Sequence, residues 1–283
     1  ISQATNGQEA LAALRQGLGQ VMLLDLTMPV MDGYETLAAI RAEGLACKVL
    51  VVSGDVQEEA LRRVKELGAL AFIKKPADPE ILRSSLIELG LFDPAATPTA
   101  VTQTAVLDSL KVNFRDALRE VTNIAMGRAA ALLAKALGVF VQLPVPQVNI
   151  FEVSELHMTL TDAMHGERMS AVCQGFTGDG IAGESLLLFH DSEVADMARL
   201  LNWQPKDDLE TSEMLLDLAS IIIGACLSGI AEQIDVRFSQ GHPQLLGQHS
   251  SIEQLIKLNQ RRWKKTLAVE VSYSLEAHNV HFD

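Results

Sequence analysis

The chain of 283 residues has few cysteines and a deficit of positive charge. It contains 3 Cys, and its 23 Lys and Arg face 36 Asp and Glu, which gives a net charge of −13. The cysteines lie in apolar segments, so we expect buried free thiols rather than disulfides or a zinc site. Nucleic acid and anionic membrane surfaces attract clustered Lys and Arg, so the charge argues against both as partners.

Long hydrophobic runs are also missing. The most apolar stretch, Leu218 to Ala231, covers 14 residues and is too short to span a bilayer. We therefore expect it to be a core helix, and we find no secretory signal pattern. With 48% hydrophobic residues, the sequence predicts a soluble cytoplasmic protein of one or two domains with ample cores.

The first 91 residues alternate between short apolar runs and helical segments, a pattern that predicts a doubly wound α/β domain. Unbroken apolar runs are typical of buried parallel strands. In the last helix, Asp78 is the expected N-cap and Pro79 lies in the first turn. The predicted strands are 21–26, 48–54 and 68–75, and the predicted helices are 31–44, 56–68 and 78–90.

Residues 92–104 are rich in Pro, Thr and Ala and predict a linker, so we place domains at 1–91 and 105–283. The second domain has a mixed α+β pattern. Its predicted helices are about 107–137, 192–202, about 211–234 and 251–263. Its predicted strands are 170–178, 183–189 and a terminal strand over 266–276.

The second domain repeats itself at an offset of 97 residues. A polar trio, a glycine one turn later and a distant proline all recur, which predicts a duplication with two long helices related by a pseudo-two-fold axis. The matched pairs are Asp116 with Glu213, Glu120 with Asp217, Asn123 with Ser220, Gly127 with Gly224, and Pro146 with Pro243.

Glu120, Asn123 and Gly127 share one face of the first long helix. Asn is a poor helix former, and Gly costs roughly 1 kcal/mol relative to Ala in a helix, so close backbone approach is expected at Gly127. A solvated polar stripe with a helix-packing glycine is the plainer alternative. The repeat favours a functional face, because a solvated stripe has no reason to recur with a proline at matched distance.

Three motifs resemble response-regulator receiver domains, in the order and at the spacing of that family: "VMLLDLTMPVMDG", "VVSGD" and "AFIKKP". The resemblance covers residues 1 to about 91 and implies a flavodoxin-like fold. It implies that Asp25 is the phosphorylated residue, that Ser53 hydrogen-bonds the phosphoryl group and that Lys75 pairs with it. Phe72 stands at the position of the family's switch aromatic, and the neighbouring Lys74 is expected to face solvent.

The same resemblance implies a sensor histidine kinase as phosphodonor and Mg²⁺ as cofactor. Asp25 and the backbone carbonyl of Thr27 would be two Mg²⁺ ligands. The family's first strand ends in an acidic pair that supplies most of the site, and this sequence lacks that strand, the first helix and the pair. We expect residues 1–11 to lie near the family's second strand.

The pattern D-x-x-x-E-x-x-N, followed 22 residues later by Pro, resembles the signature of the CheC/CheX family of CheY phosphatases. The resemblance covers roughly 105–283 and implies that Asn123 positions the hydrolytic water and that Glu120 pairs with the receiver lysine. Asp116 would be peripheral and Pro146 structural. The second copy, Asp217 and Ser220, is predicted to be weak or inactive, because Ser220 has no carboxamide.

Three other features are expected to be incidental. "GDGIAG" at 178–183 precedes a strand rather than a helix, so we expect a hairpin turn and not a dinucleotide site. Residues 259–265 form a small basic patch that we expect to be a solvated helix end; docking of an acidic receiver is the alternative. His278 and His281 show no zinc spacing.

The sequence thus predicts a receiver fused to an aspartyl-phosphate phosphatase that is regulated by phosphorylation at Asp25. The phosphatase would act on a CheY-like receiver or on its own, in cis or in a homodimer. One alternative is a non-enzymatic adaptor that binds a phosphorylated partner. Another makes the receiver an inert dimerisation platform.

Overall fold

The computed structural model describes residues 2–92, 113–152, 168–250, 265–276, 278 and 280–282. The chain divides into two compact units, Ile1–Glu120 and Val121–Asp283. Apart from Phe92, the predicted linker 92–104 lies outside the described residues, so its boundaries stay a prediction.

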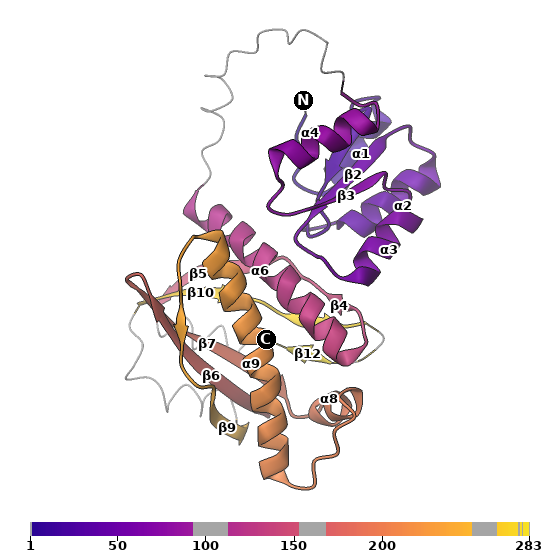
Figure 1. The fold of residues 1–283 in the computed structure, drawn as a ribbon. Coiled ribbons are helices and arrows are strands. Elements are labelled where there is room, and N and C mark those ends of the chain that lie inside the picture. The colour runs from indigo at the N-terminus through magenta and orange to yellow at the C-terminus, as the bar shows by residue number, and fades with distance from the viewer. Residues whose placement is uncertain are drawn as a thin grey trace. The chain divides into compact units, whose positions relative to one another are not determined.

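In the first unit, the described residues up to Phe92 form three parallel strands and four helices; the strands and the last three helices follow the predicted order (Figure 1). Strand β2 lies between β1 and β3, with Leu24 opposite Val51 and Val51 opposite Phe72. Asp78 caps the last helix by accepting from the N–H groups of Glu80 and Ile81. The elements are α1 (Gly7–Arg15), β1 (Val21–Leu24), α2 (Gly33–Glu43), β2 (Lys48–Ser53), α3 (Glu58–Glu66), β3 (Ala71–Lys74) and α4 (Pro79–Glu88).

Helix α1 was not among the elements predicted from the sequence. The described residues before it form no strand, and a helix begins at Gly7. The Asn6 side chain accepts from the Glu9 N–H at 3.0 Å, while the Glu9 carboxylate accepts from the Thr5 N–H at 2.8 Å. Reciprocal bonds of this kind satisfy the free N–H groups at a helix start, and the sequence analysis did not weigh them.

Strand β1 lies at one edge of the described three-stranded sheet. Its Val21 and Leu23 side chains are 38% and 51% exposed. An edge strand with exposed apolar side chains offers backbone groups and surface on which another element can pack. The β1 side of this sheet is therefore incompletely covered by the described residues.

The second unit places the long helices α6 and α9 against one face of an antiparallel sheet (Figure 1). The main sheet runs β4-β11-β12-β7-β6-β8, β9 also pairs with β6, and β5 pairs separately with β10. The elements are α6 (Phe114–Leu137), β4 (Val141–Gln142), β5 (Gln147–Glu152), β6 (Met169–Gly178), β7 (Ile181–His190), α8 (Val194–Leu200), α9 (Asp208–Gln233), β8 (Ser239–Gln240), β9 (Gln244–Ser250), β10 (Lys265–Glu270), β11 (Tyr273–Leu275) and β12 (His281–Phe282).

Two predicted elements of this unit differ in their limits. Helix α9 starts at Asp208 rather than about 211, because the Asp207 side chain caps it by accepting from the Glu210 N–H. The single terminal strand predicted over 266–276 is wrong: β10 pairs with β5, whereas β11 pairs with β4 and β12. The predicted helix 251–263 and nearly all of the basic patch 259–265 lie outside the described residues.

The hairpin prediction at 178–183 is confirmed. Strands β6 and β7 pair from Met169 opposite His190 to Gly178 opposite Ile181. Asp179 and Gly180 form the connection with φ values of 49° and 81°. Positive φ at both central residues is the two-residue turn that Asp-Gly favours.

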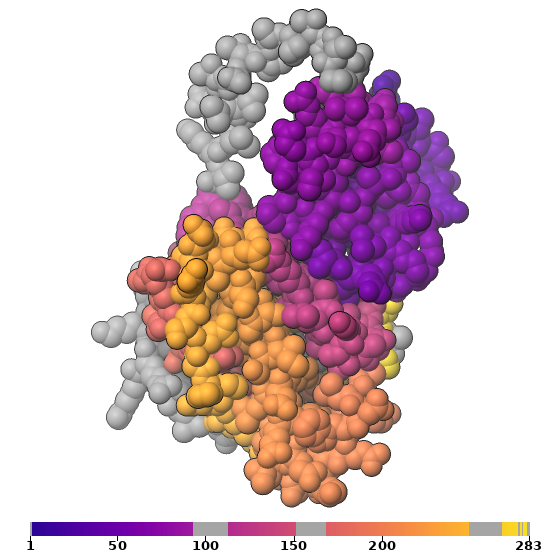
Figure 2. Space-filling view, viewed as in Figure 1, coloured from indigo at the N-terminus to yellow at the C-terminus, as the bar shows by residue number. Residues whose placement is uncertain are grey.

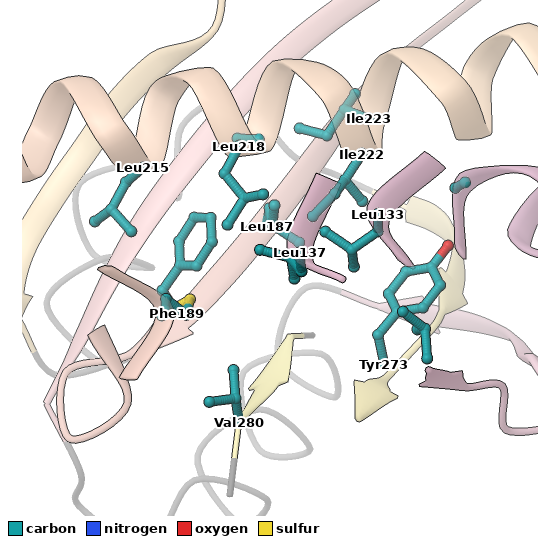
Figure 3. Close-up of a cluster of buried hydrophobic side chains, with 14 of the residues drawn as sticks. Leu133, Leu137, Leu187, Phe189, Leu215, Leu218, Ile222, Ile223, Tyr273 and Val280 are labelled. Atoms are coloured by element: carbon teal, nitrogen blue, oxygen red, sulfur yellow. The ribbon is translucent and has the colours of Figure 1, made fainter. Parts of the chain in front are cut away.

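The core of the second unit is built mainly by α6, α9 and β7 (Figure 3). Leu133, Leu215, Leu218 and Phe189 are at most 2% exposed. By length and composition α9 could cross a membrane, with a mean hydropathy of 2.1 over its most apolar window. The core helix of a soluble protein passes the same test, and the predicted core role of 218–231 agrees with the buried Leu218, Ile222 and Leu227 of α9.

Strand pairing also follows the 97-residue offset. Gln147 lies opposite Glu270 in the β5–β10 pair, and Cys173 lies opposite Gln244 in the β6–β9 pair. Shifting one member of the first pair forward by 97 and the other back by 97 gives the second pair. Val148 with Val269 and Val172 with Leu245 obey the same rule. Within the second unit, each copy of the repeat therefore pairs its strands with strands of the other copy.

Helices α6 and α9 lie in close contact at a glycine that sequence analysis did not single out. A Cβ added at Gly229 would lie 2.8 Å from the Ala125 Cα, whereas one at Gly224 would meet nothing nearer than the Gln240 Oε1 at 3.7 Å. Helix backbones can approach this closely only where side chains are small.

We expect Gly229→Ala to lower the free energy of unfolding by about 1–3 kcal/mol, because the helices must separate. Gly224→Ala, on the same helix, should instead raise it by up to about 1 kcal/mol through helix propensity. Urea unfolding of both variants tests this. Equal effects would show that no tight contact exists at Gly229.

Candidate functional site

Asp25 follows β1 directly and is positioned by the start of α2. The Asp32 side chain caps α2 and forms a reciprocal capping box with Glu35. Gly33, the first residue of the helix, donates its N–H to the Leu26 carbonyl at 3.0 Å. A Cβ at Gly33 would lie 2.4 Å from the Asp25 carbonyl oxygen, so only glycine lets the helix start pack on this backbone.

Lys75 and Asp25 form the central ion pair of the first unit. The Lys75 Nζ donates to the Asp25 Oδ2 at 2.7 Å, and the Thr27 N–H donates to the Oδ1 at 3.3 Å. Burial raises the pKa of Asp25, and the Lys75 charge offsets this only in part. Burial alone would lower the pKa of Lys75, but its bond with Asp25 helps to raise it, so the lysine stays charged. Lys74 is exposed, as predicted.

Ser53 and Phe72 occupy the neighbouring strands. Ser53 ends β2, is fully buried and accepts the Asp55 N–H at its Oγ at 3.1 Å. Phe72 lies on β3, partly buried against the core. The structure thus joins Asp25, Thr27 and Lys75 by direct bonds and places Ser53 at the end of the adjacent strand.

The loop after Asp25 contains a strained residue. Val30 has a φ of 69°, and the Met31 N–H donates to the Pro29 carbonyl at 2.8 Å, which closes a three-residue turn. A β-branched residue with positive φ is unusual and costs on the order of 1–2 kcal/mol. Val30 is 73% exposed, so little packing offsets this cost.

We expect Val30→Asn to raise the free energy of unfolding by about 1 kcal/mol, because Asn tolerates this backbone conformation. Val30→Ala keeps the Cβ and should gain less. Thermal unfolding of both variants tests this prediction. The prediction is wrong if Val30→Ala stabilises the protein as much as Val30→Asn.

Among the residues that the structure describes, no complete Mg²⁺ site is assembled near Asp25. No group of three His, Cys, Asp or Glu side chains that could hold a metal occurs in the described part of the chain. Mg²⁺ prefers six oxygen ligands, and the receiver resemblance implies two of them, the Asp25 carboxylate and the Thr27 carbonyl.

The predicted polar face of the second unit lies along α6. Glu120 is exposed, whereas Asn123 is only 5% exposed and Gly127 is buried. No hydrogen bond involves the Asn123 carboxamide among the described residues, so its polar atoms have no protein partner there. Pro146 is buried directly before β5.

Asp116 belongs to the start of α6. Its carboxylate accepts from the Asn113 side-chain amide at 2.6 Å, and its N–H donates to the Asn113 Oδ1 at 2.9 Å. Arg119 also donates to it at 3.3 Å. These contacts stabilise the helix end, which fits the peripheral position predicted for Asp116.

The second copy of the face lies on α9 at the protein surface. Asp217 and Ser220 are exposed, and Ile221 beside them is 44% exposed. Figure 2 shows this helix, in orange, running along the surface of the second unit. The two faces thus differ in burial as well as in side-chain chemistry.

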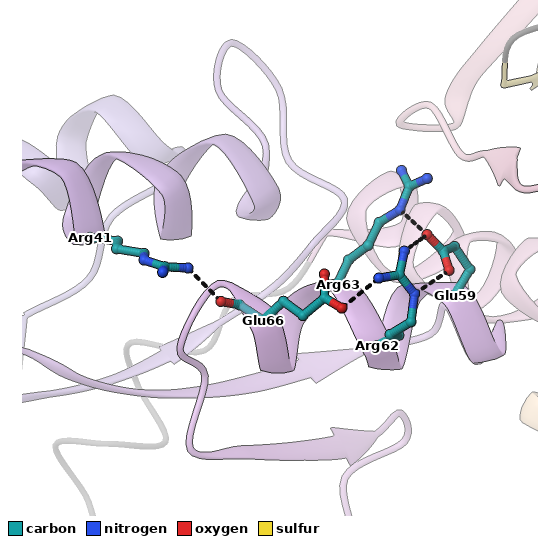
Figure 4. Close-up of polar contacts among 5 residues, drawn as sticks. All are labelled: Arg41, Glu59, Arg62, Arg63 and Glu66. Carbon is teal, nitrogen blue, oxygen red and sulfur yellow. Dashed lines mark hydrogen bonds and ion pairs between the residues drawn. The ribbon is translucent and has the colours of Figure 1, made fainter.

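Several polar contacts were missed by sequence reasoning. Asp55 is buried and bonded to Tyr34, and Arg128 on α6 forms a two-point ion pair with Glu232 on α9. On α3, Arg62 bridges Glu59 and Glu66 (Figure 4). Only the i,i+3 and i,i+4 spacing on α3 gave a readable signal; the others join residues far apart in the sequence.

Comparison with known proteins agrees with the geometry around Asp25. The family description "Response regulator receiver domain" matches residues 1–87. This part of the chain is a receiver domain. The probable C4-dicarboxylate response regulator DctR of Priestia megaterium is 33% identical over 92 residues, which cover 32% of this chain and 40% of that protein.

A protein-glutamate methylesterase/protein-glutamine glutaminase of Halalkalibacterium halodurans is 39% identical over 95 residues, 31% of this chain and 27% of that protein. The chain therefore spans less than half the length of these two relatives. The receiver domain places the protein in two-component or chemotaxis signalling.

Among solved structures, Vibrio cholerae chemotaxis protein CheY4 covers 31% of this chain and 75% of its own, with 30% identity and a TM-score of 0.30. Thermotoga maritima FliY covers 59% of this chain and 86% of its own, with 18% identity and a TM-score of 0.44. Both TM-scores are below 0.5, and neither likeness supports a statement about activity.

Proposed function

We propose that the protein is a cytoplasmic signalling protein in which a receiver, phosphorylated at Asp25, is joined to a domain that hydrolyses the aspartyl phosphate of a receiver. The observation that supports the second part most is the Glu120–Asn123 face of α6, which recurs in altered form on α9 at an offset of 97 residues. The matching strand registers at the same offset support a duplication of the whole helix-and-strand unit.

Phosphorylation would begin with attack of an Asp25 carboxylate oxygen on the phosphorus of a phosphohistidine in a sensor kinase. A new P–O bond forms as the P–N bond breaks, and the histidine leaves with the bonding electrons. The Lys75 ammonium, 2.7 Å from the Asp25 Oδ2, would then turn to neutralise the phosphoryl oxygens. The Ser53 hydroxyl would donate to one of them.

Hydrolysis would need little beyond a correctly placed water, because an aspartyl phosphate is already reactive. The water oxygen attacks phosphorus as the bond to the carboxylate oxygen breaks, releasing inorganic phosphate and the free aspartate. The Asn123 carboxamide oxygen would accept a hydrogen bond from this water and hold it in line. Glu120 would pair with the receiver lysine and fix the register of docking.

The face on α9 would be weak or inactive as a phosphatase. Asp217 keeps a carboxylate one methylene shorter than that of Glu120, but Ser220 has no carboxamide with which to orient water. Docking of a receiver lysine at Asp217 without hydrolysis is the expected behaviour of that face.

A non-enzymatic adaptor is the second candidate. The 5% exposure of Asn123 favours it, because a water-positioning side chain must be reachable by the phosphoryl group. In this case the second domain would bind a phosphorylated receiver without accelerating the loss of its phosphate.

The decay of a phosphorylated stand-alone CheY, measured with and without the protein, tests the proposal. Faster release of inorganic phosphate in its presence supports the phosphatase. An unchanged rate together with measurable binding would instead support the adaptor.

A further inference from the structure

Asp55 is a buried acidic residue that the proposed phosphoryl chemistry does not use. It follows β2 by two residues and is only 4% exposed. Its Oδ2 accepts from the Tyr34 hydroxyl at 3.3 Å, and its Oδ1 accepts from the Gln57 N–H at 3.1 Å. A carboxylate in such a place loses its hydration, so burial raises the pKa of Asp55.

Tyr34 is suited to act as the donor in this contact. Burial raises the pKa of the Tyr34 phenol, and the nearby Asp55 carboxylate raises it further, while Arg63 acts in the opposite direction and Asp32 adds to the rise. The phenol therefore keeps its proton at neutral pH. At 3.3 Å the bond is long for an O–H donor, so its individual contribution is modest.

The two residues connect the two loops that border the phosphoryl site. Tyr34 lies in the first turn of α2, directly after the loop that begins at Asp25. Asp55 lies in the connection between β2 and α3. The side-chain contact ties these segments together, although 21 residues separate them.

Asp55 also orients Ser53 directly. Its N–H donates to the Ser53 Oγ at 3.1 Å, and Ser53 is fully buried. A hydroxyl has one proton and two lone pairs, so accepting this bond uses one lone pair and leaves the proton free to be donated elsewhere. If the backbone at Asp55 moved, Ser53 would lose the partner that fixes its hydroxyl.

We propose that Tyr34 and Asp55 are positioning residues for Ser53: the Tyr34–Asp55 contact holds the β2–α3 connection so that the Asp55 N–H fixes the Ser53 hydroxyl as a donor toward a phosphoryl group on Asp25. The role in phosphoryl transfer rests on the proposed phosphorylation of Asp25. The structural part, that Tyr34 holds Asp55 and Ser53 in place, does not.

The first experiment measures amide hydrogen exchange at Asp55 by NMR in the whole, unphosphorylated chain. Tyr34→Phe removes the hydroxyl and keeps the ring. We expect exchange at the Asp55 amide to speed up about 3- to 10-fold, the loss that one modest hydrogen bond predicts. Tyr273→Phe is the matched control, because it removes the hydroxyl of the other tyrosine, which contacts Cys226 in the second unit.

The second experiment follows phosphoryl uptake from acetyl phosphate. Tyr34→Phe and Asp55→Asn should slow uptake by about 3- to 10-fold, whereas Tyr273→Phe should leave it unchanged. Phosphoryl uptake should also be slow in Ser53→Ala. Adding Tyr34→Phe to that variant should slow uptake no further, because both substitutions act through the Ser53 hydroxyl.

Each outcome decides a different point. Unchanged Asp55 exchange in Tyr34→Phe overturns the positioning role. Faster exchange with normal uptake shows that the Tyr34–Asp55 contact holds the β2–α3 connection but does not serve Ser53. This result also overturns the proposal. If the wild-type chain takes up no phosphoryl group, the proposed function fails at Asp25, and the exchange data still decide whether Tyr34 holds the loop.

Discussion

Asn123→Ala is expected to abolish the acceleration of phosphorylated CheY decay while leaving CheY binding intact. The carboxamide is the group proposed to hold water in line, and loss of such alignment typically costs about 100-fold in rate. Glu120, which would fix docking, remains in place, so the dissociation constant should change little. Phosphate release and binding are measured separately on the same preparation.

Ser220→Ala is the matched control, because residue 220 is the counterpart of Asn123 at the 97-residue offset. It should leave the decay rate unchanged, since a serine supplies no carboxamide. Asn123 lies within the helical core region and is 5% exposed, so thermal unfolding must accompany the assay. If Asn123→Ala is folded and still accelerates decay, Asn123 is not the water-positioning residue.

Asp25→Asn is expected to eliminate phosphoryl uptake altogether. The amide keeps the shape of the side chain but cannot attack phosphorus. Uptake is measured with labelled acetyl phosphate, and hydroxylamine should release the label from the wild-type chain, as expected for an acyl phosphate.

Two neighbouring lysines provide a control for this prediction. Lys75→Ala removes the ammonium bonded to Asp25 and should strongly reduce uptake, whereas Lys74→Ala changes an exposed side chain and should not. Label that persists in Asp25→Asn would place the modification elsewhere. A wild-type chain that takes up no label would favour the inert dimerisation platform.

Much of the first unit could be predicted because its signals are local. Apolar runs, helix-ending glycines and the Asp78-Pro79 start are readable over a few residues, and the strands at 21–26, 48–54 and 68–75 were found within a few residues of β1, β2 and β3. The family motifs then placed Asp25 and Lys75, which the structure joins by a direct bond.

The predictions failed where pairing over long distance decides the structure. Residues 266–276 read as one strand, yet β10 and β11 separate because they pair with strands more than 100 residues earlier in the chain. Likewise, Gly229 was not singled out from the sequence, although it makes a tight contact with Ala125 of the other long helix. Sequence periodicity shows which face a residue occupies but not which element meets it.

The sequence by itself determined that a receiver with Asp25 and Lys75 precedes a domain whose Glu120–Asn123 face recurs 97 residues later. It could do so because motif spacing and repeats are properties of the chain alone. Only the tertiary structure decided that Asp55 is buried against Tyr34 and that Asn123 is buried while its counterpart Ser220 is exposed. Burial depends on neighbours that are distant in sequence, and these set the free energy of each polar group.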